Sequence, residues 1–330
     1  MEYSPKIICT ITLVSIWLII AFISIFISKN RNKSCENYVK SKEIYVLDTT
    51  ENELENNYEN NYQAISQKVG NHTYYNDFTD IDLSIKSWNL LTSHIMKIYD
   101  YYDAFIIVIN KDKLLYTSCA MSFIIENLTK PIVFISDNLS NALHLVSGTK
   151  ICEVMILYSN RFYRATRMTT NNKKQLINTF QPLNEKNSFS IPKDFISIKY
   201  INNNLVVPIL KDNVNHLYFL KNILDQQNET VQGILINSQT FSVHLEIIEI
   251  IKQLVQKGII IVLTTDNVNI VDIDIRLIEA GVLNACNMTI YSAYTKLLFC
   301  ITQIQEKKLI GKIMDMDLRG EIKPKQLLHS

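Results

Sequence analysis

The chain has 330 residues and a net charge of +1, with lysine and arginine spread along its whole length. A chain this long can form two domains with a sizeable core, but no segment is basic enough to indicate nucleic-acid binding. Glycine is scarce, at 7 of 330 residues, so few turns can depend on its conformational freedom.

The first feature along the chain is an apolar segment, residues 7–28, which carries no charged residue. A membrane-spanning helix needs about 20 apolar residues, whereas the apolar part of a signal peptide has about 7–15. We therefore expect a single-pass membrane anchor over residues 1–28 and a polar linker over 29–42. A cleaved signal peptide is the alternative, which the absence of a small-x-small cleavage site disfavours. Basic residues flank the span on both sides, so the side of the membrane stays open.

Beyond the linker, apolar strands alternate with helical patterns. Strands are predicted at 43–50, 104–110, 131–136 and 152–158, with helices at 83–102, 114–127 and 138–147. Between the second strand and its helix we expect a short charged turn. This order predicts a parallel sheet covered on both faces by helices.

A second unit follows the irregular stretch 170–204. Strands are predicted at 233–237 and 259–265, and helices at 244–258, 274–283 and 289–303. Gly258 is the expected stop of the first of these helices. We predict a domain over residues 43–210 and a smaller, four-stranded α/β domain over 211–330.

Common cofactor and metal motifs are missing from the sequence. The six cysteines show no CxxC spacing and the six histidines no metal-ligand spacing. No GxSxG elbow, phosphate loop or dinucleotide fingerprint occurs. We therefore expect neither a metal nor a cofactor.

Several longer segments resemble the L-asparaginases, closest to the type I branch. They are "YDAFIIVINKDKLLYTSCAMSFIIENLTKPIVFIS" (102–136), "KGIIIVLTT" (257–265), "RLIEAGVLNACNMTIYSAYTKLLF" (276–299) and "DLRGEI" (317–322). The resemblance runs from about residue 43 to 322. It implies a two-domain α/β fold with a larger N-terminal domain and a smaller, Rossmann-like C-terminal domain. It also implies a homo-oligomer, L-asparagine as substrate, and catalysis by two threonines and a lysine.

The first catalytic motif of that family, Thr-Gly-Gly-Thr, matches "VLDTTENEL". With Thr49 at the first threonine, Thr50 and Glu51 replace the glycines and Asn52 stands at the nucleophile. An amide side chain is not a nucleophile for acyl transfer. A shifted alignment brings Thr49 or Thr50 to that position but restores neither glycine.

The second motif, His-Gly-Thr-Asp-Thr, falls on Ile109–Lys113. Lys111 then replaces the second catalytic threonine, and Asp112, which in the family holds the substrate's amino group, is retained between two lysines. We expect Asp112 to pair with one of them.

Two further positions of the family's site also differ here. Arg167 follows "R-A-T" where the family has its catalytic lysine, and arginine does not lose its proton at working pH. A substrate-contacting serine is matched by Phe78, next to Thr79, so both positions of the binding loop are vestigial.

These substitutions fall together in separate loops, and loss of a nucleophile alone typically costs about 10⁴–10⁶ in rate. We predict a membrane-anchored, asparaginase-like protein without amidohydrolase activity that serves as a binding or scaffold module. The alternative is an active L-asparaginase that forms an acyl-enzyme on Thr49, Thr50 or Thr117 and releases ammonia and aspartate, with Asp112 holding the amino group.

Overall fold

The computed structural model describes residues 42–50, 72–75, 82–171, 175–178, 181–192, 194–211, 216–225, 231–237, 245–265 and 273–322. The chain divides into two units, Met1–Ser41 and Lys42–Ser330, and all described residues belong to the second. The anchor predicted at 7–28 lies outside the described residues. Within the ranges given above, no helix is long and apolar enough to cross a membrane.

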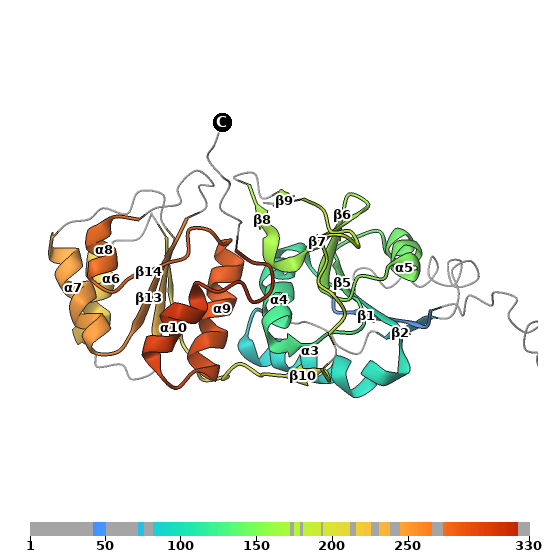
Figure 1. Ribbon diagram of the computed structural model, residues 1–330, viewed down its shortest axis with the longest axis horizontal. Helices are drawn as coiled ribbons and strands as arrows, with labels where there is room; N and C mark the ends of the chain where they lie inside the picture. The colour runs from blue at the N-terminus through green and yellow to red at the C-terminus, as the bar shows by residue number, and fades with distance from the viewer. Residues whose placement is uncertain are drawn as a thin grey trace, which may run out of the picture. The chain divides into compact units, whose positions relative to one another are not determined.

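The first sheet has six strands in the order β2-β1-β3-β5-β6-β7 (Figure 1). They are β1 (Ile44–Asp48), β2 (His72–Tyr75), β3 (Ala104–Val108), β5 (Ile132–Ile135), β6 (Val154–Tyr158) and β7 (Arg161–Arg164). All neighbours pair in parallel except β7, which turns back on β6 through Ser159 and Asn160. Both turn residues have positive φ, as a tight right-twisted hairpin requires. The predicted parallel sheet is confirmed, with an antiparallel strand added at its edge.

Helices cover both faces of this sheet: α3 (Ile85–Ile98) and α4 (Lys111–Ile124) on one, and α5 (Leu139–Gly148) on the other. The apolar residues of β3 contribute to the core on both faces of the sheet, because successive strand residues point in opposite directions. Ile107 packs in the cluster under α3 and α4, whereas Ile106 packs with α5. Both are fully buried.

Helix α4 begins earlier than the sequence pattern indicates. It starts at Lys111, where we predicted a turn, because the backbone N–H groups of Lys113 and Leu114 both donate to the carbonyl of Asn110. Asp112 in the first turn is favourable next to the positive end of the helix dipole. The charged segment is therefore the exposed N-terminus of a helix.

The second sheet has four parallel strands in the order β11-β12-β13-β14, as predicted. Its strands are β11 (Ile209–Lys211), β12 (Gly233–Asn237), β13 (Ile260–Thr264) and β14 (Leu283–Asn284). Helices α6 (His216–Asp225), α7 (Leu245–Gln256) and α8 (Ile275–Glu279) cover one face, and α9 (Ile290–Gln303) covers the other, with α10 (Lys307–Met314) beside α9. After α7 the chain turns at Gly258, whose φ is +84°. Strand β11 spans the predicted domain boundary at 210/211, and that boundary stays a prediction.

Further short elements are absent from the prediction. They are η3 (Ala165–Arg167) and the strands β4 (Ile125–Glu126), β8 (Met168–Thr170), β9 (Leu176–Asn178) and β10 (Ser197–Ile198). Strand β10 pairs with β4, and β8 pairs with β9, both antiparallel. Strands this short carry too little periodicity to be recognised in a sequence.

Helix α4 of the first sheet's layer packs against α9 of the second, which joins the cores of the two sheets (Figure 1). The Phe123 and Phe299 rings lie 6.1 Å apart, and Tyr116 meets Tyr291 edge to face at 4.7 Å. One apolar cluster therefore contains residues of both sheets.

Candidate active site

Two candidate segments meet at the carboxyl edge of the first sheet. Thr49 and Thr50 follow β1, and Lys111 and Asp112 follow β3, its parallel neighbour. The backbone N–H of Thr49 donates to the carbonyl of Val108 at 2.9 Å. Open α/β sheets bind ligands at this edge, so the family positions occupy the expected place.

The Thr49 side chain has a structural partner. It is 2% exposed, and its hydroxyl donates to the same Val108 carbonyl at 2.8 Å. This hydrogen bond joins the end of β1 to β3 and gives the buried Thr49 hydroxyl a backbone acceptor.

Thr50 has a different partner, the carboxylate of Asp48. Asp48 is 6% exposed, and its Oδ1 accepts the Thr50 N–H at 2.9 Å and the Thr50 hydroxyl at 2.7 Å. A hydroxyl that donates to a carboxylate is one element of an activated nucleophile. The sequence reading did not single out Asp48, although an acid directly after a buried apolar strand is a usable signal for it.

Asp112 and Lys111 are both exposed in the first turn of α4. Asp112 has no hydrogen bond or ion pair with any residue in the described part of the chain, so the predicted pairing with a flanking lysine is not seen there. The positive charge of Lys113 instead interacts electrostatically with Asp82. The pKa of Asp82 is lowered mainly by hydrogen bonds from Ser84 and Ser87, and slightly by Lys113.

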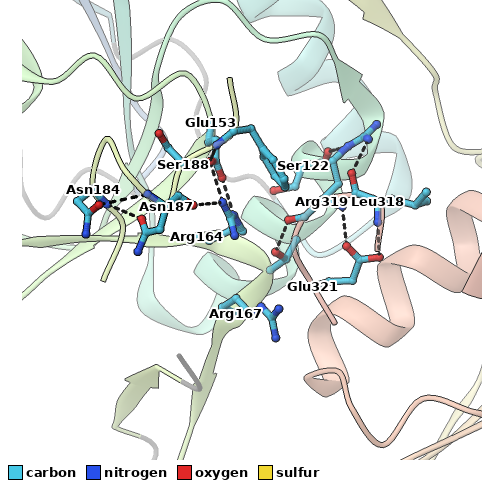
Figure 2. A network of polar contacts seen from close by, with 12 residues as sticks. Ser122, Glu153, Arg164, Arg167, Asn184, Asn187, Ser188, Leu318, Arg319 and Glu321 are labelled. Atoms are coloured by element: carbon cyan, nitrogen blue, oxygen red, sulfur yellow. Dashed lines mark hydrogen bonds and ion pairs between the residues drawn. The ribbon is translucent and has the colours of Figure 1, made fainter. Parts of the chain in front are cut away.

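Arg167, in η3, points to the C-terminal segment. It is 5% exposed, and its Nη2 donates to the carbonyl of Ile322 (Figure 2 shows it near Glu321). Burial lowers the pKa of Arg167 to about 10, against the charges of Asp317 and Glu321, so it is protonated at neutral pH. Among the described residues, Arg167 forms no hydrogen bond or ion pair with Asp112.

Of the other candidate positions, one is buried in a helix and three lie outside the described residues. Thr117 is fully buried within α4, and its hydroxyl has no hydrogen-bond partner among the described residues. Asn52, Phe78 and Thr79 lie outside the described residues. In the part of the chain that is described, no group of three or more His, Cys, Asp or Glu residues could hold a metal ion.

A buried ion pair holds the C-terminal segment on α9. Lys296 and Glu321 are both 0% exposed, with Nζ and Oε1 2.6 Å apart. Lys296 also donates to the carbonyl of Met314 at 2.9 Å, and Glu321 accepts the N–H groups of Leu318 and Arg319. Burial disfavours the Glu321 carboxylate, but the charge and hydrogen bond of Lys296 outweigh it and hold the pKa of Glu321 below its usual value.

Asp317 beside this pair predicts a pH-dependent stability. Its pKa is raised, first by burial and then by the hydrogen bond and charge of Glu321, against the charge of Arg167. A carboxyl whose pKa is higher in the folded state favours folding while it is protonated and loses that benefit as pH rises through its folded pKa. We expect Asp317→Asn to raise the melting temperature at pH 7, with the gain shrinking as pH falls toward 4. Thermal unfolding across this range measures it; Asp315→Asn, two positions away and likewise exposed, is the control, and a gain that grows on acidification would contradict the expectation.

Comparisons with known proteins agree with the fold described above. The family profile "Asparaginase, N-terminal" matches residues 43–205. L-asparaginase 1 of Escherichia coli K12 is 25% identical over 292 residues, covering 77% of this chain and 84% of that protein. L-asparaginase of Thermococcus kodakarensis is 23% identical over 293 residues, covering 78% and 89%. The structure of L-asparaginase I from Vibrio cholerae superposes with a TM-score of 0.74 at 21% identity, over 86% of this chain and all of that one.

The chain therefore belongs to the L-asparaginase family, as its motifs indicated. The structural likeness bears out the two-domain, mixed α/β architecture with parallel sheets.

Proposed function

We propose that this chain is a catalytically degenerate, membrane-anchored member of its family that binds ligands or partners and does not hydrolyse amides. The observation that carries the proposal is Lys111: an exposed cation at the helix N-terminus stands where the resemblance requires a small hydroxyl to pass a proton. The buried Thr49, whose hydroxyl is bonded to backbone, supports it.

The proposal extends to the ligand, the assembly and the membrane. Exposed Asp112, without a described partner, supports binding of the amino group of L-asparagine or a similar amino acid. Assembly into a homo-oligomer is proposed from the family resemblance. Anchoring through residues 7–28 is proposed from their apolar sequence, with the side of the membrane left open.

The test is ammonia release from asparagine and glutamine by the purified full-length chain. We expect no turnover above the protein-free blank, because the proton-transferring hydroxyl is absent. L-asparaginase 1 of E. coli serves as the positive control in the same buffer. Turnover above about 1 s⁻¹, an ordinary enzymatic rate, would overturn the proposal.

A second candidate, an active amidohydrolase, is favoured by one contact: the 2.7 Å hydrogen bond from the Thr50 hydroxyl to Asp48. Thr50 would attack the side-chain amide and form an acyl-enzyme with loss of ammonia, and water would then release aspartate. If the assay detects turnover, Thr50→Ala should reduce it by about 10⁴ or more, whereas Thr49→Ala should leave it near the wild-type level. Activity that survives Thr50→Ala would exclude this route.

A further inference from the structure

A cavity of about 190 Å³ lies away from the candidate active site, lined by parts of α4, the start of β6 and the C-terminal segment. Strand β6 begins at Val154, so Glu153 and Val154 in its lining mark the amino edge of the sheet, opposite to the edge that carries Thr50 and Asp112. Ser122, also in the lining, follows Asp112 by ten positions on α4, about 15 Å along the helix axis. The cavity is therefore a separate site.

One side of the cavity carries an arginine held rigidly in place (Figure 2). Arg164 forms two hydrogen bonds with Glu153, from Nε to Oε2 at 2.6 Å and from Nη2 to Oε1 at 2.9 Å. The two side chains are only 14% and 7% exposed. The Phe189 ring covers the guanidinium at 4.4 Å, and its backbone N–H donates to Glu153 at 2.7 Å. A guanidinium locked in this way is preorganised, so little side-chain entropy is lost when a ligand binds.

Arg319 is a second fixed cation in the lining, and it comes from the C-terminal segment. Its Nε donates to the carbonyl of Ser122 at 2.7 Å, and its Nη2 donates to Glu126 at 3.1 Å. The lining thus contains two guanidinium groups and one carboxylate, a formal charge of +1. Glu126, which pairs with Arg319, also pairs with Lys199. Their charges cancel, so including both residues leaves the formal charge at +1.

The rest of the lining is mixed: Phe189, Leu128 and Leu318 are apolar, whereas Ser122, Asn127 and Ser190 are polar. A volume of about 190 Å³ equals about six water molecules at about 30 Å³ each, room for a molecule of about ten non-hydrogen atoms. We propose that this cavity binds a small monocarboxylate with an apolar body. The carboxylate neutralises the net positive charge of the cavity's charged side chains and Lys199, and the body packs on the Phe189 ring and the two leucines. This inference does not rest on the proposed function.

Calorimetric titration of the full-length chain with phenylacetate and with its neutral isostere phenylacetamide tests the proposal. We expect saturable binding of one phenylacetate per chain, and at least tenfold weaker binding of the amide. Phenylacetate should also slow alkylation of Cys152, a lining residue with a free thiol, as measured by mass spectrometry of that peptide.

Two variants locate the ligand. Ser190 is an exposed lining residue, so Ser190→Trp should fill the cavity without disturbing the core and weaken phenylacetate binding at least tenfold. Ser140→Trp, at an exposed position of α5, is the matched control and should bind as the wild type does. No saturable binding by the wild type, or equal affinity in the Ser190→Trp protein, would overturn the proposal. Ammonia release is measured separately, so hydrolysis by this chain would leave the result unaffected.

Discussion

Replacement of Lys296 by methionine is expected to lower the free energy of unfolding by about 3–5 kcal/mol, because it leaves the Glu321 carboxylate buried without its counter-charge. Both side chains are fully buried, and Glu321 is positioned by two backbone N–H groups, so it cannot easily move to water. The carbonyl of Met314 also loses its donor. Urea denaturation measures the loss.

A second ion pair provides the control. Lys221 and Glu246 also pair, but their side chains are 46% and 56% exposed, so Lys221→Met should cost at most about 1 kcal/mol. The double variant Lys296→Met, Glu321→Leu should recover part of the loss, because it removes the buried charge as well. Equal losses in the two single lysine variants would show that burial does not set the strength of the Lys296 pair.

Gly320→Ala is expected to destabilise the fold by about 2–4 kcal/mol. Gly320 has φ +69°, which costs an alanine roughly 1–2 kcal/mol. A Cβ there would also lie 2.4 Å from Nη1 and 2.7 Å from Cδ of Arg164, and overpacking of this kind costs about 1–3 kcal/mol. Arg164 cannot move away freely because Glu153 and Phe189 hold it.

Gly148→Ala is the matched control, since it also adds one methyl group. Gly148 ends α5, and nothing lies within 4 Å of the position its Cβ would take. This variant should be neutral or more stable by up to about 1 kcal/mol, measured by the same urea denaturation. If Gly320→Ala were as stable as Gly148→Ala, the inference that Arg164 packs too closely on Gly320 to admit a Cβ would be wrong.

Much of the architecture could be predicted because its strands are continuous apolar runs. Residues 104–108 and 260–264 are of this kind, and both are central parallel strands buried in a sheet. Helices with one apolar face, such as α7, could be predicted from the sequence in the same way. The start of α4 was misplaced because Lys111, Asp112 and Lys113 are as suitable for an exposed first turn of a helix as for a loop. Strand β7 escaped notice because its four residues, "RFYR", begin and end with charge.

The candidate site could be predicted only in part. Alignment to family motifs singled out Thr49 and Asp112, which lie at one edge of the sheet in the structure. It did not reveal that the Thr49 hydroxyl donates to Val108, 59 positions away, or that Arg167 turns to Ile322, 155 positions away. Such contacts depend on how distant segments pack, and local residue patterns do not record them.

The sequence by itself determined which chemical groups are available at the family's catalytic positions: lysine at 111, aspartate at 112 and arginine at 167. It also determined the alternation of strands and helices, because apolar periodicity is a local property of the chain. Only the tertiary structure decided the partners of the polar groups: Thr50 with Asp48, Lys296 with Glu321, and the two arginines with the cavity. The physical reason is that a buried polar group must be satisfied by whatever the fold brings to it, and for Arg319 that is a carbonyl 197 positions away.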